Sequence, residues 1–130
     1  MADIVQRDVF SARQKDVTVL AATTIVIPPI NLLRFDKKTF SVKNLGSFAW
    51  ASANLQATSV EVPGVAGVGP GPSGDAADWE DIDTTTFATL AAGAYKSKQI
   101  STDSRKWWRL IATVSSTASI ARAYVDAASI

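Results

Sequence analysis

Apolar and polar residues alternate with a period of two through most of the chain, which is the pattern of half-buried β-strands. The alternating runs lie at 17–27, 39–44, 48–61, 79–83, 95–101, 105–114 and 118–127. Residues rich in Gly, Ser, Thr and Asp separate them, and no alternation of strands with helices appears. The pattern therefore predicts an all-β fold, a single jelly-roll-like β-sandwich of about seven or eight strands.

The pattern allows more than one interpretation for three of these runs. The run 17–27 is one bent strand or two short ones, and we expect it to stop at Pro28-Pro29, because proline cannot donate to a strand ladder. In 48–61 the alanines and Leu55 face inward, so Trp50 shares the outer, polar face. The run 118–127 also fits helical spacing, but the Ser-Ser-Thr turn before it favours a strand.

Two segments stand apart from the strands. Residues 1–15 mix apolar and charged side chains, and they are either a terminal segment without fixed structure or an extended arm on a neighbouring subunit. The domain itself then spans 16–130. Residues 62–78 hold five of the seven glycines and three of the five prolines, which predicts a long loop. This loop has neither the Gly-Lys-Ser/Thr of a P-loop nor a GxGxxG motif.

The composition excludes several classes of function. The chain of 130 residues has no Cys and no His, so it has no disulfides, Cys/His zinc sites, thiol nucleophiles or Ser-His-Asp triads. Its formal net charge of +1 argues against a dedicated nucleic-acid or membrane-surface protein. Its start, MADIVQRDVFSARQKD, has no apolar signal region, so we expect synthesis in the cytosol. We predict no catalytic residue, no cofactor and no metal.

The charges form two clusters of opposite sign. The segment 75–83 carries five carboxylates, and the segment 96–109 has a net charge of +4 with Trp107 and Trp108 inside it. The alternatives are a Ca²⁺ site in the first segment, although its spacing departs from the EF-hand, and a single-stranded nucleic-acid site in the second. We expect instead that the two segments face each other, and between subunits rather than within one.

Tryptophans offer a second binding hypothesis. Exposed, coplanar Trp50, Trp107 and Trp108 would form a platform for sugar rings, whereas burial at a self-interface would indicate an assembly protein. A glycosidase that uses Glu61 and Glu80 as its pair of carboxylates is the weakest alternative. The two glutamates flank the long loop, but in so small a chain we expect such an arrangement by chance.

The layout of three stretches resembles a known group of proteins. These stretches are FSVKNLGSFAWASANLQATSVE, DWEDIDTTTFATLAAGAYKS and KWWRLIATVSSTASIARAYV. Together they resemble the small β-sandwich accessory proteins of tailed-phage virions, namely head decoration (cement) proteins and tail-associated modules. The likeness lies in the order of strands and turns over about 39–127, and no catalytic residue comes with it.

That resemblance implies a non-enzymatic virion protein that binds and stabilises the viral major capsid protein or other virion subunits, most often as a homotrimer. The alternative is a carbohydrate-binding or adhesion module of a phage tail, whose partner is a glycan. The residues that we expect at protein interfaces are Ile4, Val5, Val9, Phe10, Trp50, Trp107, Asp78, Asp81, Asp83, Lys96, Lys98, Arg105 and Lys106.

Overall fold

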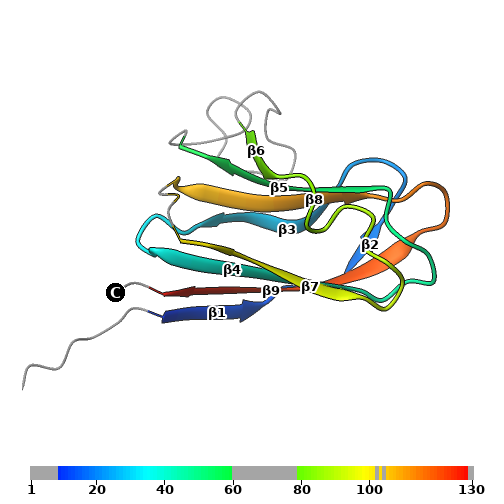
Figure 1. Cartoon of the computed structure of the whole chain (residues 1–130), viewed down its shortest axis with the longest axis horizontal. Coiled ribbons are helices and arrows are strands. Elements are labelled where there is room, and N and C mark those ends of the chain that lie inside the picture. The colour runs from blue at the N-terminus through cyan, green and yellow to red at the C-terminus, as the bar shows by residue number, and fades with distance from the viewer. Residues whose placement is uncertain (1–8, 60–78, 102, 104, 129–130) are drawn as a thin grey trace, which may run out of the picture.

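The structure is a computed structural model that describes residues 9–59, 79–101, 103 and 105–128. Two antiparallel sheets pack face to face, and the described residues contain strands and no helix (Figure 1). The nine strands are β1 (Val9–Arg13), β2 (Val17–Val19), β3 (Thr24–Asn31), β4 (Lys37–Asn44), β5 (Ser52–Thr58), β6 (Glu80–Asp83), β7 (Tyr95–Ile100), β8 (Trp107–Thr113) and β9 (Ser119–Ala128).

The order of the strands is that of a jelly roll. Sheet A has the order β1-β9-β4-β7, with β2 also paired to β9, and sheet B has the order β3-β8-β5-β6. Strands at equal distance from the middle of the chain pair with each other: β5 with β6, β4 with β7, β3 with β8, and β2 with β9. This rolled-up hairpin confirms the predicted all-β, jelly-roll sandwich.

Strand count and strand ends differ from the expectation in two places. Residues 9–13 pair with β9 of the same chain, so this part of the predicted arm is strand β1. The run 17–27 divides into two strands of different sheets, and β3 continues through Pro28-Pro29 to Asn31. It tolerates both prolines because it is the edge strand of sheet B, with shifts in register on either side of Ile27.

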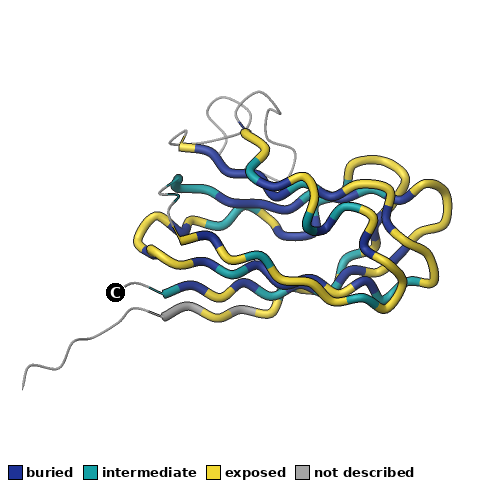
Figure 2. The backbone as a smooth tube through the Cα atoms, viewed as in Figure 1, coloured by how far each residue is buried: buried dark blue, intermediate teal, exposed yellow. Residues whose placement is uncertain are grey.

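The core fills the space between the sheets with inward residues of both sheets (Figure 2). On β9 the inward positions are mostly alanines, and the outward positions are polar apart from Ile120 and Ala128. Phe40 of sheet A stacks on Trp108 of sheet B, with ring centroids 5.5 Å apart. The inward face predicted for Ala53, Leu55 and Ala57 of β5 is confirmed, but Ala49 and Ala51 are exposed because they lie in the β4–β5 connection. The strand predicted for 118–127 is also confirmed.

Candidate functional site: a rigid loop end with exposed apolar residues

The connections β2–β3, β4–β5, β6–β7 and β8–β9 gather at one end of the sandwich, at the right of Figure 1. We call this the loop end. Figure 2 shows that many residues of this end are exposed. Three large apolar side chains of this end are open to solvent: Leu20 at 52%, Phe48 at 59% and Ile120 at 45% exposure. We call these three residues the loop-end patch.

One buried asparagine fastens the loops of this end to each other. The side-chain amide of Asn44 donates to the carbonyl oxygens of Phe48 at 2.8 Å and of Leu90 at 2.9 Å. Its Oδ1 accepts from the backbone N–H of Gly46 at 2.8 Å and from the hydroxyl of Ser119 at 2.6 Å. All four hydrogen-bonding positions of this side chain are therefore in use.

The backbone of Asn44 adds two further bonds. Its N–H donates to Ala94, and its carbonyl accepts from the N–H of Gly93, which lies in the left-handed region at φ 73°. Ser119 also accepts a hydrogen bond from the indole N–H of Trp50 at 3.2 Å. A Cβ atom at Gly46 would lie 2.3 Å from the Oγ of Ser119, so glycine is required for this close approach.

The three residues of the loop-end patch are carried by segments that hydrogen bonds join to each other. Leu20 accepts a backbone hydrogen bond from Val114, and Ile120 accepts one from Leu45, so both flank the same loops as Phe48. Between Phe48 and the β8–β9 connection is a hollow of about 240 Å³ that Val114 also lines. The hydrogen bond from Asn44 fixes the backbone at Phe48, and an interface anchor on an ordered loop loses less freedom on binding.

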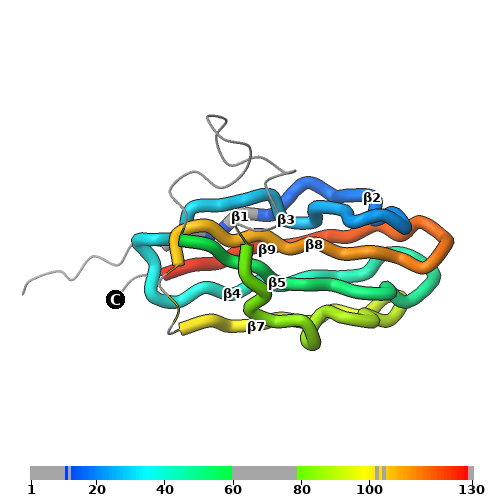
Figure 3. Tube along the Cα trace, turned by 90° about the horizontal axis from the view of Figure 1, so that it is seen from above, coloured from blue at the N-terminus to red at the C-terminus, as the bar shows by residue number. Residues whose placement is uncertain are grey.

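The acidic and basic segments do meet, and they meet inside one chain. Strands β6 and β7 are the edges of the two sheets on the same side of the sandwich (Figure 3). Lys98 lies 3.7 Å from Asp83, and Arg105 lies 2.9 Å from Glu80. The expectation of pairing between subunits is corrected for these residues, because the topology places the two segments side by side.

The carboxylate of Asp83 is bound by hydrogen bonds and an ion pair from its own chain. Burial raises the pKa of its carboxyl, but hydrogen bonds from Thr86 and Thr85, together with Lys98, outweigh burial and lower the pKa to about 2. Asp81 accepts from Gln56 at 2.8 Å. Within the described residues no group of three or more acidic side chains is placed to hold a metal ion.

The tryptophans do not form the platform that sugar binding requires. Trp50 and Trp108 are 1% and 0% exposed, so Trp50 is corrected from an interface candidate to a core residue. Trp50 lies in the β4–β5 connection and not on the outer face of β5, where the predicted strand 48–61 had placed it. Trp79 is also buried, against the guanidinium of Arg109 at 4.4 Å. Trp107 is half-buried, with the ammonium of Lys106 over its ring at 5.8 Å.

Other predicted interface residues remain predictions. Lys96 is exposed on β7, at the edge of sheet A. Val9 and Phe10 lie in β1, and the placement of their side chains is outside the description. Ile4, Val5, Asp78 and the predicted loop 62–78 lie outside the described residues.

Sequence reasoning missed the residues that shape the loop end. The predicted strand 48–61 placed Phe48 on a regular polar face, which hid its position in a loop. One signal was available: Asn44 followed by Leu45-Gly46 fits an Asx-turn, in which the asparagine side chain accepts from the N–H two residues later. Its long-range partners Leu90 and Ser119 carry no signal in the local sequence.

Comparison with known proteins adds information on the fold. No protein-family model matches the sequence, and a search of curated proteins finds no match. A solved structure described as "Bacillus endospore appendages form a novel family of disulfide-linked pili" is similar, with a TM-score of 0.50 and 11% identity. The alignment covers 100% of this chain and 96% of that chain. At this identity the likeness shows a shared fold.

The part of the chain that the structure describes has no helix long and apolar enough to cross a membrane.

Proposed function

We propose that the chain is a non-enzymatic structural subunit of a larger protein assembly and that it binds its neighbour through the loop end. The observation that carries this proposal is Phe48, 59% exposed on a loop that Asn44 holds in place with buried hydrogen bonds. Protein interfaces are enriched in aromatic residues, and a few such residues supply most of the binding energy.

Within that class, we propose an accessory role, as a decoration (cement) protein on a virion. Jelly rolls occur in viral capsid proteins, and the sequence layout resembles phage decoration proteins. A second candidate is the subunit of a filament, which the fold likeness to a pilus protein supports over the whole chain. The chain has no cysteine, so any filament it forms is held together without disulfides.

Electron microscopy of the purified chain separates the two roles. A decoration protein stays as discrete particles over a wide range of concentration, and sedimentation velocity then gives its oligomeric state, for which we expect a trimer. Long filaments with a regular repeat support the second candidate and contradict the first.

Substitution of Phe48 tests the shared proposal. We expect Phe48→Ser to fold normally and to be lost from the native particles that contain the wild-type chain. Unchanged incorporation of Phe48→Ser, or absence of the wild-type chain from every particle fraction, contradicts an attachment through the loop end.

A further inference from the structure

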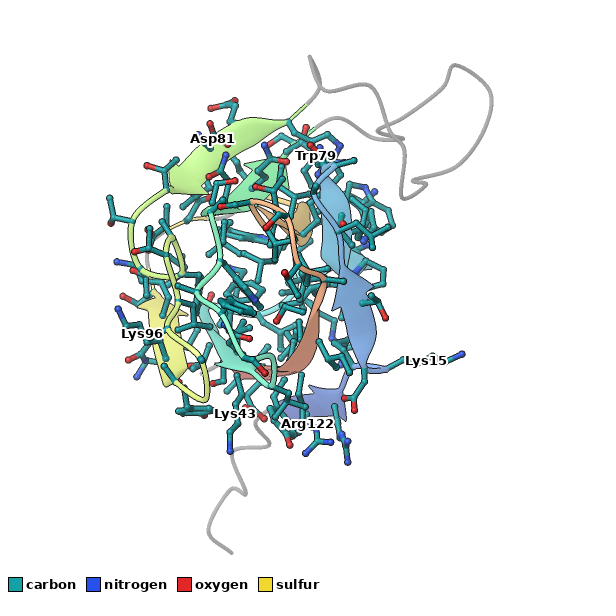
Figure 4. The ribbon with its side chains drawn as sticks, turned by 90° about the vertical axis from the view of Figure 1, so that its right-hand side faces the viewer. Lys15, Lys43, Trp79, Asp81, Lys96 and Arg122 are labelled. Carbon is teal, nitrogen blue, oxygen red and sulfur yellow. The ribbon has the colours of Figure 1, made fainter. Side chains whose placement is uncertain are left out.

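The outer face of sheet A carries a group of cations beside the loop-end patch. In the register of sheet A, Lys43 of β4 lies directly opposite Arg122 of β9. Arg13 of β1 lies opposite Tyr124, one outward position from Arg122. Figure 4 shows Lys43 and Arg122 next to each other on the sheet A side of the loop end. We call Arg13, Lys43 and Arg122 the cation cluster.

Among the described residues, one carboxylate forms ion pairs with this cluster. Asp16 lies 3.1 Å from Arg122 and 3.5 Å from Arg13. Lys43 is exposed and has no carboxylate within 4.0 Å among the described residues. Like charges directly opposite each other on neighbouring strands, with Cβ atoms about 5 Å apart, destabilise a sheet. Asp16 offsets part of this repulsion through Arg122, so Lys43 is the cation of the pair that is left for a carboxylate of a partner.

The cation cluster is continuous with the loop-end patch. Ile120 is the next outward residue on β9 before Arg122, and it lies opposite Thr18 on β2. An apolar area therefore borders a group of cations on one surface. We infer that this surface binds a protein partner whose contact area is apolar and rimmed with carboxylates.

A second copy that meets the chain through the same face does not supply that partner surface. Two copies meeting through the same face would bring cation clusters of equal sign together, which electrostatics opposes. The carboxylates of β6 are already engaged within the chain, since Arg105 binds Glu80, Gln56 binds Asp81, and Thr86 and Lys98 bind Asp83. We therefore assign the complementary charge to a different protein, as the decoration role requires, and filaments formed by the chain alone contradict this inference.

Nucleic acids and sulfated glycans fit the surface less well. A sulfated glycan has no apolar area to cover Leu20, Phe48 and Ile120. A single-stranded nucleic acid offers bases to Phe48 but binds chiefly through its phosphates, and two of the three cations of the cluster are already paired with Asp16. A protein surface offers both kinds of contact at once, with an apolar centre and a charged rim. This inference rests on the proposed function, because it names the chemistry of the neighbour that the loop end binds.

Binding of labelled probes to the whole chain tests the inference. The probes are a 21-residue peptide of repeated Glu-Glu-Leu, poly-glutamate of equal length, heparin and a single-stranded DNA of about 20 nucleotides. We expect the Glu-Glu-Leu peptide to bind most tightly at 50 mM salt. Lys43→Glu should weaken it about tenfold, because a rim charge acts on association and is screened by salt.

The controls separate the possible failures. Lys43→Arg keeps the charge and should bind as the wild type does, and Arg34→Glu reverses an exposed charge at the opposite end and should also bind normally. Tighter binding of heparin or DNA, no binding of the peptide, or equal loss in Lys43→Glu and Arg34→Glu overturns the inference. Failure of the proposed function shows separately, as full incorporation of Phe48→Ser into native particles.

Discussion

Replacement of Asn44 by alanine removes the side chain that holds the loop end together. The change leaves the carbonyl oxygens of Phe48 and Leu90 without their donors. It also leaves the hydroxyl of Ser119 and the N–H of Gly46 without their acceptor. The hydroxyl can rotate and Gly46 is only half-buried, so these two groups recover part of their bonding from water.

The expected loss of stability follows from the groups that stay buried. An unsatisfied buried polar group costs about 1–3 kcal/mol. Two carbonyls with partial losses at the other two groups give about 3–5 kcal/mol for Asn44→Ala. A domain of this size has a free energy of unfolding of about 5–15 kcal/mol, so this single side chain accounts for a large fraction of it.

Urea unfolding followed by tryptophan fluorescence measures this loss. Trp50 is buried and donates to Ser119, so it reports directly on the affected region. With a slope of about 1.5 kcal/mol per M, the midpoint should fall by about 2–3 M urea. Asn54→Ala is the matched control, since Asn54 is half-buried on β5 and the change should stay within about 0.5 kcal/mol. A loss below about 1 kcal/mol for Asn44→Ala refutes the role of Asn44 in fixing these loops.

Three further predictions concern single groups. Gly46→Ala forces a Cβ against Ser119 at 2.3 Å, so we expect a loss of about 2 kcal/mol in urea unfolding, and an unchanged midpoint contradicts the close approach. Burial raises the pKa of Asp83, but its hydrogen bonds, chiefly from Thr86, hold the pKa near 2; the stability it contributes, about 2 kcal/mol, is present above pH 4 and is lost as the pH falls toward 2. Asp83→Asn should remove that part of the pH dependence. If the free energy of unfolding falls equally steeply between pH 4 and pH 2 in both proteins, Asp83 does not contribute it. Lys38 is 1% exposed, and burial lowers its pKa; Lys38→Met should leave the melting temperature equal or higher, whereas a large decrease shows that its ammonium is needed for folding.

The period-two pattern is a strong predictor here because both sheets have one buried face. On β8 alternation grouped Trp108, Leu110 and Ala112 on one face, and the structure shows that this face is buried. The Ser-Ser-Thr turn before β9 correctly favoured a strand over the competing helical spacing. The order of the strands in the sheets follows from how far each lies from the middle of the chain, so a jelly roll was within reach of the sequence.

The loop end was not predictable in the same way. Phe48 is apolar and lies between two strands, so the local pattern assigns it to the second strand. Its exposure depends instead on the conformation of the loop, which the hydrogen bond from Asn44 fixes. The hydrogen bonds from Asn44 to Leu90 and from Ser119 to Asn44 join residues far apart in sequence. The charged segments show the same limit, because their opposite signs predicted a pairing while only the topology decides that it forms within one chain.

The central claim is that the loop end is the surface through which the chain enters its assembly. Leu33 is a matched control for Phe48, because it is 56% exposed and lies in the β3–β4 connection at the opposite end of the sandwich. The direct measurement is the amount of Phe48→Ser and of Leu33→Ser in native particles, relative to the wild-type chain, with both variants shown to unfold at the wild-type urea concentration. We predict near-complete loss of Phe48→Ser and normal incorporation of Leu33→Ser. Equal incorporation of the two variants, or selective loss of Leu33→Ser, contradicts the account.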